Sequence, residues 1–228
     1  MADFSSVSFR PRPLGLCALA VGLIAVSIVG CVQLLDPQRS DATYYLLDRS
    51  AQSASSTDTT GLKVGLRQPR LASYLDSRRM VTRRGPTRIQ FAEFHRWGED
   101  LNQSIGRTVA LALGDQPGIQ SAELVPWPKG VTFDYLVQLH VLSFEGVGPA
   151  PRPEAEEDAS ASEGHSRMVV QWTILSSRDD TILAREFTRH RETGWPVDDY
   201  QALASNLSTS LDVLADEIGT RLKTLDRP

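Results

Sequence analysis

The sequence has few residues of the kinds that build disulfide frameworks or metal sites. Its 228 residues include only two cysteines, and its four histidines are widely spaced. A single cysteine pair cannot form the several disulfides of a small secreted scaffold, and a zinc site needs several cysteine or histidine ligands at short spacing. We therefore expect neither a disulfide framework nor a bound metal. The histidines are His95, His140, His165 and His190.

The sequence also lacks the short motifs of common catalytic sites. It contains no Gly-x-Ser-x-Gly element and no glycine-rich phosphate-binding loop. Its formal net charge of −4 at pH 7 disfavours nucleic acid as a partner, because phosphate binding depends on a basic surface. Three acidic pairs lie at expected turns or helix starts, where capping explains them: Glu99-Asp100, Asp179-Asp180 and Asp198-Asp199. We therefore predict a protein that is not an enzyme.

Only one long apolar run is present, close to the N-terminus. The 17 residues from Leu14 to Gly30 carry no charge, follow Arg10 and Arg12, and end at Cys31. This run is short for a membrane-spanning helix, which needs about 20 residues, and has the features of a secretory signal. The tetrapeptide Ile28-Val29-Gly30-Cys31 resembles the bacterial lipoprotein signal, in which the cysteine becomes the lipid-modified first residue. An uncleaved anchor helix is the alternative.

These features predict three parts of the chain. Residues 1–30 form a lipoprotein signal peptide, and residues 31–42 are a polar, turn-rich tether. The tether begins at Cys31, which would carry a covalent diacylglycerol and an N-acyl chain and no other cofactor. Acyl chains contribute about 0.8 kcal/mol of membrane affinity per buried methylene, so two or three of them anchor a protein stably. Residues 43–228 then form one domain.

Apolar alternation and β-prone composition predict most of this domain as strands. The segment 84–86, Arg-Gly-Pro, predicts a hairpin, and 133–141 is the longest alternating run and should be a central strand. Residues 146–166 are rich in proline and acidic residues and predict a mobile hairpin loop. The expected strands are 43–47, 62–66, 79–83, 87–91, 119–125, 133–141, 168–174 and 181–190.

Two helices complete the predicted domain. One begins at Glu99 and Asp100 and ends near Gly114, and the other shows apolar residues at steps of three and four from Tyr200 to Leu222. Strands followed by packed helices favour the α+β class. We therefore expect a single α+β domain with a mainly antiparallel sheet and two helices packed on one face.

One segment, Leu71–Trp97, combines arginines with aromatic residues in an otherwise acidic chain. Such a combination favours a surface for a protein partner or lipid headgroups. The alternative places the arginines on the solvent face of a hairpin and the aromatics in the core. Trp195, in a Gly-Trp-Pro loop, is a further bulky residue that could mark a contact surface. The candidate partner-binding residues are Arg79, Arg83, Arg88, Arg96, Trp97 and Trp195.

The same segment carries a resemblance to a known family. Tyr74-Leu75-Asp76, followed some twenty residues later by Phe94-His95-Arg96-Trp97, is similar to a pattern of the ABC-type transport auxiliary lipoproteins. This is the family of paraquat-inducible protein C (PqiC). The resemblance extends in pattern from about Tyr44 to Leu222 and includes the lipid signal.

The resemblance implies a non-enzymatic subunit of an intermembrane lipid transport system in the Gram-negative envelope. Its implied partners are a mammalian-cell-entry (MCE) protein and an integral membrane subunit. Val32 follows Cys31, so an aspartate that resembles an inner-membrane retention signal is absent. We therefore expect a lipid anchor in the outer membrane, with the domain facing the periplasm. A structural lipoprotein that assists outer-membrane assembly without handling lipid is the alternative, and a docking collar would suit a ring of identical subunits.

Overall fold

The computed structural model describes residues 41–47, 60–150 and 163–226. The chain divides into two compact units, Met1–Asp41 and Ala42–Pro228. The predicted signal peptide, Cys31 and all but the end of the tether lie outside the described residues. Every described core side chain belongs to Ala42–Pro228, so this unit carries its own hydrophobic core and can fold as a domain. None of the described helices is long and apolar enough to cross a membrane.

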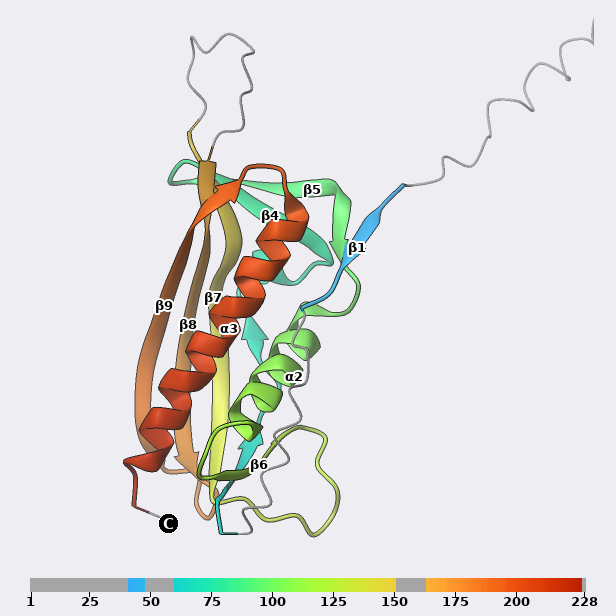
Figure 1. Cartoon of the computed structure of the whole chain (residues 1–228). Helices are drawn as coiled ribbons and strands as arrows, with labels where there is room; N and C mark the ends of the chain where they lie inside the picture. Colours follow the sequence, from blue (N-terminus) through green and yellow to red (C-terminus); the bar gives the residue numbers. More distant parts are fainter. Residues whose placement is uncertain (1–40, 48–59, 151–162, 227–228) are drawn as a thin grey trace, which may run out of the picture. The chain divides into compact units, whose positions relative to one another are not determined.

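The described part of the domain contains nine strands, two α-helices and one short 3-10 helix (Figure 1). The predicted strands and both helices are present, but four of the strands extend at least five residues beyond the expected bounds. The elements are β1 (Thr43–Tyr45), β2 (Leu62–Leu66), β3 (Arg70–Leu71), η2 (Ser73–Leu75), β4 (Arg79–Arg84), β5 (Arg88–Trp97), α2 (Leu101–Gly114), β6 (Ile119–Leu124), β7 (Tyr135–Gly148), β8 (Glu163–Ser176), β9 (Ile182–Pro196) and α3 (Tyr200–Lys223).

Strand β7 organises the sheet, as its long alternating sequence predicts. One edge of β7 pairs along nearly its whole length with β8, which pairs in turn with β9. The other edge pairs successively with β2, β3 and β4, and β2 then pairs with β6. Strand β1 joins through β5, the partner of β4. The central position of β7 is therefore confirmed.

The sheet is mixed, and its two halves differ in strand direction. The long ladders β7–β8 and β8–β9 and the β4–β5 hairpin are antiparallel, as predicted. The strands that meet the other edge of β7, and the β1–β5 and β2–β6 pairs, are parallel. These parallel pairs join segments that are distant in the sequence, so local patterning carries no information about their direction.

Both helices lie on the same side of the sheet, in agreement with the prediction (Figure 1). Six fully buried apolar residues follow one another along α3 at steps of three and four. Positions at this spacing form one stripe along a helix, and this stripe packs against the sheet. The side chain of Asp199 caps this helix by accepting a hydrogen bond from the Ala202 amide at 2.9 Å. The buried residues are Leu203, Leu207, Leu211, Leu214, Ile218 and Leu222.

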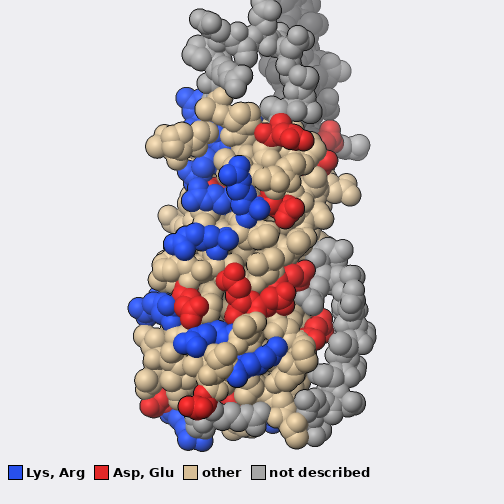
Figure 2. Space-filling model, turned by 60° about the vertical axis from the view of Figure 1, so that its left-hand side comes forward, with Lys and Arg blue, Asp and Glu red and all other residues tan. Residues whose placement is uncertain are grey.

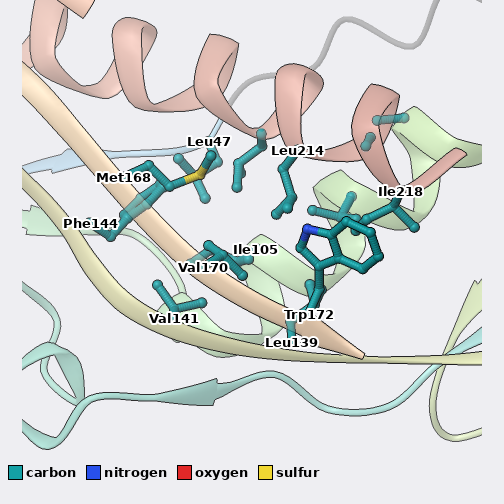
Figure 3. Close-up of a cluster of buried hydrophobic side chains, with 14 of the residues drawn as sticks. Leu47, Ile105, Leu139, Val141, Phe144, Met168, Val170, Trp172, Leu214 and Ile218 are labelled. Atoms are coloured by element: carbon teal, nitrogen blue, oxygen red, sulfur yellow. The ribbon is translucent and has the colours of Figure 1, made fainter. Parts of the chain in front are cut away.

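The main core lies between these helices and the strands β7 and β8 (Figure 3). Side chains from β7 (Leu139, Val141) and from β8 (Val170, Trp172) alternate toward the helices, where they meet Leu214 and others. Because strand side chains alternate between faces, the intervening residues of β7, β8 and β9 lie on the opposite face. No described α-helix covers that opposite face.

The predicted loop between β7 and β8 is shorter than expected. Strand β7 continues to Gly148 and β8 begins at Glu163, so residues 146–148 and 163–166 belong to the ladder. The intervening residues 151–162, on which the prediction of mobility falls, lie outside the described residues. These strand ends are polar, so their sequence does not show the apolar alternation that predicts a strand. They are held in the ladder by backbone hydrogen bonds.

Candidate partner-binding surface

The arginine-rich segment forms the β4–β5 hairpin, and an irregular pairing exposes two of its aromatic side chains. The ladder pairs Arg79 with Arg96 and then Val81 with Phe91, so β5 advances by five residues while β4 advances by two. Such a bulge bends a strand and redirects its side chains. Phe91 is 41% exposed and Phe94 48% exposed. The hairpin therefore presents bulky apolar groups to solvent.

The same hairpin also exposes cationic side chains. Arg79 and Arg88 are exposed, and neither forms an ion pair among the described residues. Tyr44 of β1 is the register partner of Arg96, and Arg96 is the register partner of Arg79. These three residues therefore form a row across β1, β5 and β4. We call Tyr44, Arg79, Arg88, Phe91 and Phe94 the hairpin surface. Arg96 lies partly buried within it.

Two predicted contact residues are tryptophans that the structure places in the core. Trp97 is 3% exposed and its ring lies 6.0 Å from that of Phe144. Trp195 is fully buried, and its indole N–H donates to the carbonyl of Asp199 at 2.8 Å. The prediction that they contact a partner is therefore wrong. Trp195 lies near the end of β9, where its ring packs against the start of α3.

Arg83 is also removed from the candidate surface, because it forms a largely buried ion pair with Glu145 of β7. Its Nε donates to Oε1 at 2.7 Å and its Nη2 to Oε2 at 3.3 Å. The side chain of Glu145 is fully buried and that of Arg83 is 17% exposed. The hydrogen bond to Glu145 raises the pKa of Arg83 above its ordinary value. This pair fixes the hairpin to the central strand.

The pattern that resembles the lipoprotein family consists of residues 74–76 and residues 94–97, and both parts contain residues with structural roles. The hydroxyl of Tyr74 donates to the carbonyl of Leu142 at 3.0 Å, and burial raises the pKa of that hydroxyl. Leu75 is almost fully buried. His95 lies between Tyr45, at 2.9 Å from the hydroxyl to Nδ1, and the stacked ring of Tyr200 at 4.0 Å. The pattern therefore holds η2 and β5 in place.

Sequence reasoning missed a second group of cationic residues. Strands β8 and β9 place Arg167, Arg189 and Arg191 on neighbouring positions of one face. The available signal was the spacing of the arginines at 189 and 191 in an alternating strand, but their proximity to Arg167 follows only from the ladder. Among the described residues, no three His, Cys, Asp or Glu side chains form a group that could hold a metal ion.

The domain with this hairpin surface matches a known family over most of its length. The family model of the ABC-type transport auxiliary lipoprotein component matches residues 44–219. The chain therefore belongs to this family, which confirms the resemblance found in the sequence. The match includes η2, the hairpin, α2 and most of α3. A comparison with curated proteins finds no match.

Solved structures share the fold at low sequence identity. Protein XCC0632 from Xanthomonas campestris is similar with a TM-score of 0.59 and 18% identity, over 80% of this chain and 93% of that one. A second structure, of an uncharacterized protein, has a TM-score of 0.59 and 14% identity over 79% and 98% of the two chains. A PelC dodecamer from Paraburkholderia phytofirmans reaches a TM-score of 0.42 at 14% identity, over 73% and 91%. The first two confirm the α+β fold.

Proposed function

We propose that the protein is a non-enzymatic subunit of an MCE-type intermembrane lipid transport system. In this proposal the acylated Cys31 anchors it to the outer membrane, and the domain faces the periplasm. There it docks the periplasmic end of the MCE partner, while an integral membrane subunit completes the system. Membership of the transport auxiliary lipoprotein family supports this role, and the residue after Cys31 supports the choice of membrane.

The observation that carries the proposal is that one hairpin exposes both Phe91 and Phe94 and also Arg79 and Arg88, which form no ion pair among the described residues. Aromatic residues and arginine are enriched at the energetic centres of protein interfaces, whereas a soluble domain gains nothing by exposing them. The surface includes Tyr44 of β1, the first strand after the tether. The surface therefore includes the strand that directly follows the tether in the sequence.

The test is capture of the MCE protein by the soluble domain, residues 42–228. We expect the double variant F91A/F94A to weaken capture strongly, since truncating a central interface aromatic costs about 2 kcal/mol or more, which is roughly 30-fold in affinity. The charge reversal R79E/R88E should weaken it as well. The matched control is R185E/F187A, which alters an exposed arginine and an exposed phenylalanine on β9.

Three outcomes separate the alternatives. Capture that survives both hairpin variants refutes the choice of surface. Loss of capture in the β9 control to the same degree shows that the effect is nonspecific. A wild-type domain that fails to capture the MCE protein, but co-purifies with an outer-membrane assembly protein, favours the alternative structural role. Labelled fatty acid incorporation tests the anchor separately, because C31A removes the only predicted acylation site, whereas an uncleaved anchor helix would survive the change.

A further inference from the structure

The sheet face opposite the helices contains a cavity of about 580 Å³. It lies where a bulge between Val141 and Ser143 of β7 meets β8 and β9. The side chains of Met168 and Val170 point toward the helices, so the alternating residues of β8 lie on the cavity face. The lining residues are Leu142, Ser143, His165, Arg167, Met168, Val169, Arg189, His190 and Arg191.

Three arginines crowd this cavity without a carboxylate among the lining residues. Arg167 and Arg191 are direct register partners on β8 and β9, and Arg189 lies opposite Val169 one step along the same face. All three are exposed and none forms an ion pair within the described part of the chain. Figure 2 shows Lys and Arg side chains gathered on the upper part of the face nearest β9.

This arrangement costs stability in the absence of a ligand. Like charges directly opposite each other on neighbouring strands are destabilising. Groups that break such a rule without a compensating gain within the fold are candidates for function. Arg189 is partly compensated, because its guanidinium lies 4.9 Å from the centre of the Phe187 ring. The Arg167 and Arg191 pair has no such compensation among the described residues.

The acidic residue opposite Arg167 in the ladder is already paired, and Glu192 lies 3.3 Å from the His190 ring. Glu145 of β7 is the register partner of Arg167, but both of its carboxylate oxygens accept hydrogen bonds from Arg83 and its side chain is fully buried. The cavity therefore keeps its positive charge. Burial and the neighbouring charges of Arg191 and Arg167 lower the pKa of His165, which agrees with a strongly cationic environment.

We propose that this cavity binds the phosphate group of an anionic phospholipid headgroup. Arginine binds phosphate through paired, charge-assisted hydrogen bonds, and three arginines around one cavity provide several such donors. Leu142 and Val169 add apolar contacts beside them, which suits a phosphate attached to an apolar chain better than a free anion. The choice of a lipid over another phosphate compound rests on the proposed role in lipid transport. The assignment of phosphate as the bound group rests only on the arginines of the cavity.

The test measures binding of the soluble domain to vesicles of phosphatidylcholine with and without phosphatidylglycerol, by flotation. We expect binding only to the anionic vesicles. R191Q should weaken it about tenfold or more, because it removes a charge-assisted hydrogen bond to the phosphate, and R167Q/R191Q should abolish it. R185Q is the matched control: it removes the same charge from the same face of β9, outside the cavity. It should change binding less than twofold.

The outcomes are distinct. Equal loss in R185Q and R191Q overturns the proposal, because net charge alone would then explain binding. Inorganic phosphate that binds the domain as tightly as the anionic vesicles overturns the assignment to a lipid. A glutamate-rich peptide that displaces the vesicles more effectively than soluble glycerol phosphate overturns it in favour of an acidic protein partner. The cavity variants should retain capture of the MCE protein and the hairpin variants should retain vesicle binding, so the two proposals fail separately.

Folding does not confound this test. The substituted arginines are exposed, and removing one of two facing like charges should leave thermal stability unchanged or slightly raised. A fall in the unfolding temperature of R191Q by several degrees would show that the residue has a structural role instead. Circular dichroism of each variant therefore accompanies the binding measurements.

Discussion

Removing one partner of the ion pair between Arg83 and Glu145 should be among the most destabilising single substitutions in the domain. We consider the variant R83M, which keeps much of the apolar stem of the side chain and removes the guanidinium. The carboxylate of Glu145 would then lose the partner of both its oxygens while remaining fully buried. The backbone carbonyl of Pro86, in the hairpin turn, would lose a hydrogen bond from the same guanidinium.

The magnitude follows from the burial of the carboxylate. Removing one partner of a buried pair typically costs about 3–5 kcal/mol, because it leaves an uncompensated buried charge. A domain of this size is stable by only about 5–15 kcal/mol, so R83M should lose about a fifth or more of its stability. Replacing both partners with apolar residues of similar size is often neutral. The double variant R83M/E145L should therefore recover most of the loss.

Urea unfolding of the soluble domain, followed by tryptophan fluorescence, measures these differences through the linear dependence of the free energy on denaturant. The control is R88M, which makes the same substitution at an exposed arginine of the same hairpin and should change stability by less than about 0.5 kcal/mol. A loss below about 1 kcal/mol in R83M, or a double variant no more stable than R83M, would refute the reasoning from burial.

Three further predictions test other features of the fold. W195A should lose about 3–5 kcal/mol of unfolding free energy in urea, since it empties a fully buried site, and a loss typical of a surface residue would contradict its place in the core. D199A should lose about 1 kcal/mol, because its carboxylate caps α3; an unchanged midpoint would contradict that role. Burial lowers the pKa of His165 from 6.5, so its contribution to stability is complete above this pH and decreases as pH falls. H165Q should therefore show a weaker acid dependence in thermal melts than the wild type, and an identical pH profile would contradict this.

The sequence predicts the parts of this fold that depend on local pattern. The C-terminal helix has apolar residues at helical spacing, and the antiparallel strands alternate clearly, so their positions and neighbours follow from nearby residues. The parallel pairs of β2, β3 and β4 with β7 join segments distant in the chain. Their direction depends on how the loops close in space, and no local feature of the sequence records it.

The candidate site shows the same division. Exposed Phe91 and Phe94 lie in a bulge of β5, which breaks the alternation that would otherwise assign them to a face. Trp195 lies between a glycine with a φ of 80° and a proline. This local sequence is typical of a loop, although the Trp195 side chain is buried in the core. Arg83 is in an alternating strand, but its partner lies 62 residues away. The composition of residues 71–97 indicates a candidate surface. Only the long-range contacts decide which side chains of this segment are exposed and available to a partner.

The Arg83–Glu145 pair also connects the two proposed binding regions. It joins the hairpin to β7, and it occupies the carboxylate that faces Arg167 across the ladder. In R83M that carboxylate keeps its negative charge without its partner and opposes the positive charge of Arg167, its register partner, so anionic vesicle binding should fall even in molecules that remain folded at low temperature. R83M/E145L removes the carboxylate as well and should bind like the wild type. Restored stability without restored binding would show that Glu145 does not compete for the cavity, and that the arginines there act independently of the pair.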